Sequence, residues 1–120
     1  MLAKIKNNTI KASNITLNPS DYIPPKVVLN DIRVSYKSEN GKKTDEIETV
    51  RYDVINPDTF ETFTIKVDGS APVISPENFD TEEKKIYIEI PVDKVIIKPY
   101  KIEYGVVYLS ITAPNVKIIK

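Results

Sequence analysis

Apolar and polar residues alternate over short stretches along most of this chain. Valine, isoleucine, tyrosine and phenylalanine fill every second position, and polar residues stand between them. A period of two places successive side chains on opposite faces of a β-strand, and β-branched and aromatic residues favour strands. The pattern predicts five strands within residues 28–36, 50–54, 63–67, 86–92 and 107–111, and two shorter ones within residues 4–12 and 116–119.

The same alternation predicts which side chains enter the core. In the first long strand, the apolar face is predicted to carry Val28, Ile32, Val34 and Tyr36. In the later strands Ile88 and Leu109 lie on the apolar face, whereas Tyr87 and Tyr108 fall out of that register. These two tyrosines are therefore expected to point away from the core.

Prolines and polar clusters divide the chain into short pieces. Nine prolines and only three glycines leave no room for a long helix. Asn40-Gly41 is a turn signal inside a polar loop that we predict over residues 38–44. Ser75-Pro76-Glu77 is typical of a helix start, with an N-cap serine, a proline at the first helical position and an acid in the first turn. This helix is predicted to last about one turn.

Several short strands with one short helix predict an all-β fold. We favour a small antiparallel barrel over a sandwich, because a closed sheet has no exposed edges to protect. At 120 residues the chain is predicted to form a single domain. Residues 1–25 are interpreted as an N-terminal strand and an irregular connection, and residues 26–120 as the β-barrel domain.

The composition narrows the possible chemistry. The chain has no histidine, cysteine or tryptophan, so the commonest general base, the commonest nucleophile pair and nearly all zinc sites are absent. Its acids are scattered or adjacent, as in Asp45-Glu46 and Glu82-Glu83, with no spacing that brings carboxylates together. We therefore expect no metal site, no cofactor and no enzymatic activity, with lysine or carboxylate catalysis as the least favoured alternative.

Charge and hydropathy bear on location and partners. Seventeen basic and seventeen acidic residues cancel, which argues against a surface that attracts polyanions everywhere but permits a local basic face. No stretch approaches the roughly 18 apolar residues of a membrane span, and the N-terminus lacks the apolar core of a signal peptide. Together with the lack of cysteine, these features predict a cytoplasmic protein without a membrane partner.

Tyrosines and lysines interleave between Lys94 and Tyr108. Tyrosine rings on an open sheet face, flanked by lysines and by Arg33 or Arg51, can stack on nucleic-acid bases while the cations follow the phosphates. This region is therefore a candidate site for single-stranded DNA. The candidate nucleic-acid-binding residues are Arg51, Tyr87, Lys98, Tyr100, Lys101, Tyr104 and Tyr108. The alternative is that these tyrosines pack on an outer sheet surface or a dimer contact, with the lysines solvating its rim.

Several stretches, in the same order along the chain, also resemble those of a known family. They are Gly41-Lys42-Lys43-Thr44-Asp45-Glu46-Ile47, Val50-Arg51-Tyr52-Asp53-Val54, Thr64-Ile65-Lys66-Val67, Ala71-Pro72-Val73, Phe79-Asp80 and the strands from Ile86 to Ile119. Over residues from about 28 to 120 the chain resembles the YdcP/HelP-like family of small accessory proteins from integrative and conjugative elements (conjugative transposons) of Gram-positive bacteria. The resemblance implies an oligonucleotide-binding-like barrel that helps a relaxase and a host helicase unwind element DNA, and it implies no catalytic residues.

Two functional hypotheses follow. The first is a non-enzymatic helicase-processivity accessory of conjugative-element DNA transfer and replication. The second is a protein-interaction or assembly module of a mobile element or phage that uses the same outer face. The zero net charge favours the second, whereas the Lys94–Tyr108 interleaving and the family resemblance favour the first. The oligomeric state and direct contact with DNA stay open.

Overall fold

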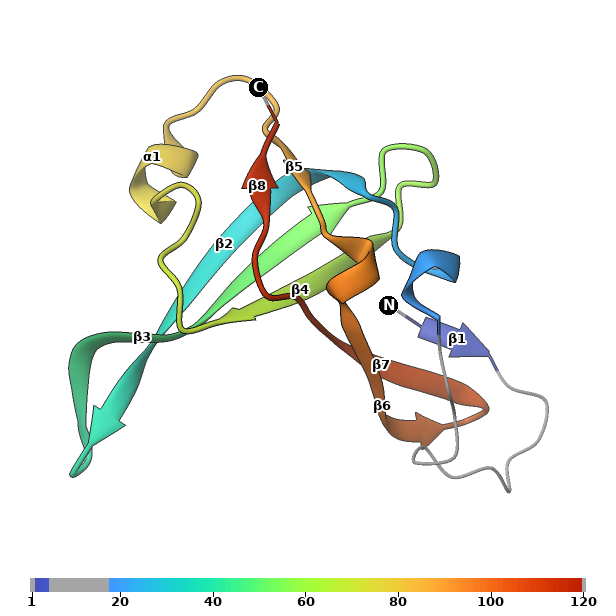
Figure 1. Ribbon diagram of the computed structural model, residues 1–120, viewed down its shortest axis with the longest axis horizontal. Coiled ribbons are helices and arrows are strands. Elements are labelled where there is room, and N and C mark those ends of the chain that lie inside the picture. Colours follow the sequence, from blue (N-terminus) through green and yellow to red (C-terminus); the bar gives the residue numbers. More distant parts are fainter. Residues whose placement is uncertain (1, 5–17, 120) are drawn as a thin grey trace.

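The computed structural model describes residues 2–4 and 18–119, and consists of strands with one short α-helix (Figure 1). The strands are β1 (Leu2–Lys4), β2 (Lys26–Glu39), β3 (Lys42–Ile55), β4 (Thr62–Asp68), β5 (Tyr87–Glu89), β6 (Ile96–Glu103), β7 (Val106–Thr112) and β8 (Lys117–Ile118). The helix is α1 (Pro76–Asp80), and η2 (Pro19–Asp21) and η3 (Val92–Lys94) are single 3-10 turns. The predicted all-β class with one short helix is confirmed. Most of the strand predicted at residues 4–12 lies outside the described residues.

One curled sheet contains all the strands. β2, β3 and β4 form an antiparallel meander, and β7 joins β4 in parallel at one position, Lys66 opposite Thr112. β6 pairs along one edge of β7, so β4 and β1 share its other edge. At the far side of the meander, β5 pairs with the start of β2, and β8 pairs with β5.

The sheet does not close into a complete barrel. β5 is bonded to β2 and β6 to β7, and these two short strands follow each other in the chain. Between them, Pro91 has no N–H to donate and η3 turns the backbone, so the ladder is interrupted. The arrangement is thus an open, barrel-like sheet, and the predicted removal of all strand edges is not achieved.

The core lies on one face of the meander. Ile32, Tyr52 and Ile65 stand directly opposite one another across β2, β3 and β4, and each is 5% exposed or less. Ile88 and Leu109 are buried as predicted, while their neighbours Tyr87 and Tyr108 are only half-buried on the opposite side of their strands. The two-residue period therefore assigned these faces correctly.

The predicted face of the first strand is wrong at two positions, Val28 and Tyr36. Tyr36 is 44% exposed and lies beside a register shift in β2. Val27 and Leu29 are buried and Val28 is half-buried, so Val28 does not share the face of Ile32. The register shifts between Leu29 and Asp31, which leaves Asn30 as a β-bulge. An extra residue in one strand reverses the parity on either side of it. This bulge also places Asn30 at the groove described below.

Two further features differ from the prediction: the extent of one loop and the presence of one strand. The polar loop predicted over residues 38–44 is strand except at Asn40-Gly41, where both residues have positive φ and close a two-residue turn. The resulting β2–β3 arm, residues 36–48, extends beyond β4 (Figure 1). β6 was not predicted because Pro99 interrupts its apolar pattern; an edge strand tolerates this proline, and the register shifts next to it.

The structure confirms the predicted start of the short helix. Ser75 is the N-cap, its Oγ accepts a hydrogen bond from the Asn78 N–H at 3.2 Å, and Pro76 is the first helical residue. The helix ends at Asp80, close to the predicted end, because nothing in so short a segment supplies a second apolar turn.

Tyr52 gives a prediction for alkaline pH. Its ring is 1% exposed, and its hydroxyl oxygen accepts a hydrogen bond from the Val73 N–H at 3.1 Å. Burial raises the pKa of the Tyr52 phenol above 10.0, and the bond from Val73 opposes this effect. The stability that this group contributes is therefore complete below the unfolded-state pKa of about 10 and is lost as the pH rises through the folded-state value.

Urea unfolding at a series of pH values should show the free energy of unfolding declining more steeply above about pH 10 in the wild-type protein than in Tyr52→Phe. At neutral pH, Tyr52→Phe should cost about 1–3 kcal/mol because the Val73 N–H loses its partner. Parallel pH curves for the two proteins would show that Tyr52 ionises equally easily in the folded and unfolded chain.

Candidate nucleic-acid interface

Three cations stand in a row across the face of the meander opposite the core. Arg33 on β2 lies directly opposite Arg51 on β3, and Arg51 lies directly opposite Lys66 on β4. Like charges at directly opposed positions destabilise a sheet. We call these three residues the cation row; an anion bound over it would relieve the repulsion between neighbouring strands.

The cations of this row differ in how far they are neutralised. Nη2 of Arg33 lies 2.9 Å from Oδ1 of Asp53, and the Thr64 hydroxyl donates a hydrogen bond to the same oxygen. Arg51 donates to the Ser35 hydroxyl at 3.1 Å. Neither Arg51 nor Lys66 forms an ion pair with a carboxylate in the part of the chain that the structure describes. Two positive charges are thus available to an external anion.

The surface beside the cation row is hollowed. β4 and β7 pair at a single position and separate beyond it, which leaves a groove between them. A basic hollow of about 240 Å³ is lined by Arg33, Arg51, Thr64, Lys66, Tyr100, Leu109, Ser110 and Ile111. A second hollow of about 460 Å³ is lined by Asn30, Asp53, Thr62, Phe63, Thr64, Tyr100 and Leu109. Because Thr64, Tyr100 and Leu109 line both, the two hollows adjoin each other.

Aromatic side chains continue from this groove onto the β6–β7 hairpin. The ring centroids of Tyr100 and Tyr108 are 6.2 Å apart with a tilt of 49°, a separation typical of interacting aromatic rings. Nζ of Lys101 lies 4.5 Å from the centre of the Tyr108 ring and 3.1 Å from the Glu103 carboxylate. The hydrogen bond and charge of Glu103 raise the pKa of Lys101. Lys101 is therefore cationic but already paired.

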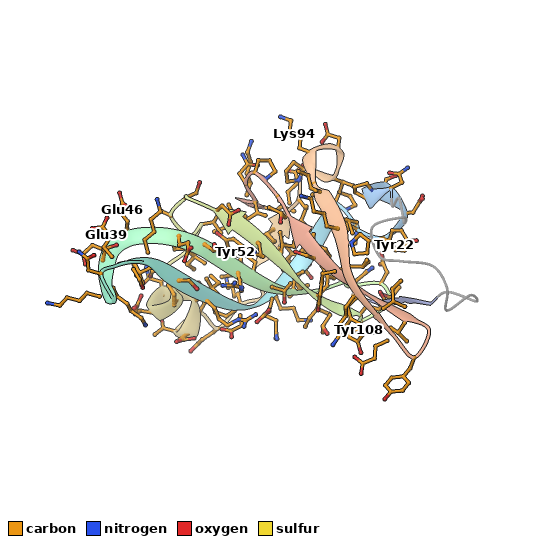
Figure 2. All side chains as sticks on the ribbon, turned by 90° about the horizontal axis from the view of Figure 1, so that it is seen from below. Tyr22, Glu39, Glu46, Tyr52, Lys94 and Tyr108 are labelled. Carbon is orange, nitrogen blue, oxygen red and sulfur yellow. The ribbon has the colours of Figure 1, made fainter. Side chains whose placement is uncertain are left out.

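The structure brings most of the predicted site residues to this region. Arg51 and Tyr100 line the basic hollow, and Tyr108 and Lys101 adjoin Tyr100. Lys98 stands opposite Ser110, another residue of the hollow. Figure 2 shows Tyr108 near the β6–β7 hairpin and Glu39 and Glu46 at the far end of the molecule, on the β2–β3 arm.

Two predicted residues lie apart from the groove. Tyr104 forms the tip of the β6–β7 turn, where it is 94% exposed and has a φ of 53° next to Gly105. Tyr87 lies on β5, with β2, β3 and β4 between it and β7, and its ring is covered by Nζ of Lys26 at 4.7 Å. The structure therefore does not unite Tyr87 with the other candidates.

The sequence alone did not identify Lys66, Asn30 and Asp53 as site residues, and it offered Arg33 only as an alternative to Arg51. Arg33 and Lys66 were visible as polar positions of predicted strands, but their alignment with Arg51 depends on the pairing register. The role of Asn30 depends on a bulge that no local signal marks.

Within residues 2–4 and 18–119, no three acidic, histidine or cysteine side chains gather closely enough to hold a metal ion. Across the same residues, no helix has the length and apolar character needed to cross a membrane. Comparison with protein families, with functionally characterised proteins and with solved structures finds no match to this chain. The cation row and its groove are therefore the features of the molecule that bear on its function.

Proposed function

We propose that this protein is a non-enzymatic module that binds single-stranded DNA through the cation row and the adjoining tyrosines. The observation that carries the proposal is the alignment of Arg33, Arg51 and Lys66 across three strands, with two of the three charges unpaired by any described carboxylate. Oligonucleotide-binding barrels use the face of their second and third strands. In this meander those strands are β3 and β4, which carry Arg51 and Lys66.

The chemistry of the face suits a single strand better than a duplex. Cations that follow the backbone, next to aromatic rings that can stack on bases, bind unpaired nucleotides with little sequence preference. Arg51 and Lys66 supply the phosphate contacts, and Tyr100 and Tyr108 supply two neighbouring rings. Few phosphates are neutralised, so affinity should be micromolar or weaker and should fall with salt.

The family resemblance gives this binding a biological setting. A single-strand-binding module without catalytic groups can act as a helicase-processivity accessory during the transfer and replication of a conjugative element. In this setting its partners are the relaxase and the host helicase, and it acts in the cytoplasm.

The β2–β3 arm favours a second function, the docking of a protein partner. Among the residues that the structure describes, its outer edge on β3 is unpaired over residues 42–47, up to Glu48, which accepts a hydrogen bond from the Gly69 N–H. Its outer edge on β2 is unpaired over most of the strand that follows the hydrogen bond from Leu29 to Ile86. Unpaired strand edges can accept a further strand. A bulge between Tyr36 and Ser38 distorts this ladder, which makes the arm a less regular template than a flat edge.

Fluorescence anisotropy with a labelled 12-mer of thymidine, at two salt concentrations, tests the proposal. Wild-type protein should bind at low salt, and Arg51→Ala or Lys66→Ala should each weaken binding and reduce the salt slope by up to about one unit. Tyr100→Ala should weaken binding with little change in slope, because stacking on bases releases no counterions.

The matched control is Lys85→Ala, which removes an exposed cation from the connection that follows α1. It should leave both affinity and slope close to wild type. Absence of binding at low salt, or equal effects of Lys85→Ala and Arg51→Ala, would favour the protein-docking function. Pull-down with the relaxase and the helicase would then be the next measurement.

A further inference from the structure

The two adjoining hollows of the groove have different chemistry. The basic hollow is lined by Arg51 and Lys66, whose charges have no described carboxylate partner. The larger hollow has no cationic lining residue and instead carries the oxygen-rich side chains of Asn30, Asp53 and Thr62. Tyr100 lines both. One side of the groove thus suits an anion, and the other side suits a ligand with hydrogen-bond donors.

Asp53 supplies the strongest acceptor of the larger hollow. Its Oδ1 accepts hydrogen bonds from Arg33 and Thr64, which fix the orientation of the carboxylate. In the described part of the chain, no donor is bonded to its Oδ2. The side chain is 27% exposed, so this oxygen remains accessible to a ligand. Asn30, placed here by the β2 bulge, adds an amide to the same hollow.

We propose that the two hollows together hold one nucleotide of a bound single strand, and that the larger one selects guanine over thymine. This inference rests on the proposed function. The phosphate lies beside Arg51 and Lys66, and the base enters the larger hollow against the Tyr100 ring. A volume of about 460 Å³ is within the range of small-ligand pockets and accommodates one base with its sugar.

The selectivity follows from the Watson–Crick edges of the bases. Unstacked bases in single strands are commonly read on this edge. Guanine presents two adjacent donors there, N1–H and N2–H, and a carboxylate accepts hydrogen bonds only. Thymine presents one N–H between two carbonyl oxygens, which a carboxylate repels. Guanine is therefore stabilised by Asp53, and thymine is disfavoured.

Competition between two 12-mers tests this inference on the wild-type protein. One contains only thymidine, and the other has a single central guanine, which prevents association between guanine-rich strands. The guanine-containing strand should bind about tenfold more tightly, because guanine donates charge-assisted hydrogen bonds to the Asp53 carboxylate whereas thymine presents repelling carbonyl oxygens. Strands with a central cytosine or adenine, which present one amino group each, should bind with intermediate affinity.

Asp53→Asn should bring the ratio of the two dissociation constants close to one. Asp58→Asn, an exposed change in the β3–β4 turn outside the groove, is the matched control and should retain the wild-type ratio. Equal binding of both strands by the wild-type protein would overturn the base pocket while leaving the proposed function intact. Failure of the wild-type protein to bind either strand would overturn both. The wild-type comparison decides even if Asp53→Asn does not fold.

Discussion

Replacement of Ile88 by alanine is expected to lower the free energy of unfolding by about 2–5 kcal/mol. The Ile88 side chain is 0% exposed, and its strand, β5, lies between β2 and β8. Removal of three carbon atoms from this position takes apolar contacts away from the core that β5 shares with its two neighbouring strands. The backbone around Ile88 is paired on both sides with Val27 and Ile118, which limits how far the cavity can collapse.

The matched control is the adjacent residue. Tyr87→Ala removes a larger side chain, but this side chain is only half-buried on the opposite face and is covered mainly by Lys26. Its cost should be clearly smaller than that of Ile88→Ala, although more atoms are lost. Urea unfolding of both variants, with the slope m checked for constancy, measures the difference. A larger loss for Tyr87→Ala would mean that β5 presents the opposite face to the core.

The strand faces could be predicted because they follow from local sequence. Alternation is a property of neighbouring residues, so the burial of Ile88, Leu109 and Tyr52 is visible without knowing which strands pair. The N-cap at Ser75 is equally local, since the serine bonds within its own turn.

The remaining features depend on pairing between distant segments. The Asn30 bulge changes which alternate residues of β2 face the core, and the residue type at that position does not indicate a bulge. Pro99 is acceptable because β6 lies on the edge of β7, and edge position is a property of the sheet. The pairing of β4 with β7 at one position only, beside which the groove lies, likewise arises only when the sheet assembles.

The candidate site also contains residues that local sequence indicated and residues that only strand pairing brings in. Arg51 and the tyrosines of residues 94–108 were identified from composition and interleaving. The partners that give Arg51 its significance, Arg33 and Lys66, come from strands 18 and 15 positions away in the sequence and meet it only through the pairing register. Residue type therefore suggested the kind of ligand, and strand register determines its place.

Arg51→Glu is expected to reduce the affinity for single-stranded DNA by more than tenfold without loss of stability. The change places a carboxylate between Arg33 and Lys66, at the centre of the cation row. Two repulsive cross-strand contacts become attractive, and opposite-charge pairs of this kind contribute roughly 0.2–1 kcal/mol each. The change also removes the hydrogen bond from Arg51 to Ser35, which offsets part of this gain.

Under the proposed function, DNA binding should respond to the same change in the opposite direction. The row changes from three positive charges to two, with a negative charge at its centre, so a phosphate loses one partner and meets a repulsive group. Lys85→Glu alters the net charge by the same amount at an exposed site outside the groove, and it should weaken binding far less. Anisotropy titrations and urea unfolding of the two variants measure both effects.

The combination of outcomes separates a binding role for the row from a structural one. A binding surface carries charges that are unfavourable in the free protein, so the variant that relieves them should be at least as stable as the wild type and a poorer ligand-binding protein. A structural role predicts the reverse, with reduced stability and unchanged affinity. If Arg51→Glu lost stability and still bound DNA like Lys85→Glu, Arg51 would be a structural residue and the DNA interface would lie elsewhere on the molecule.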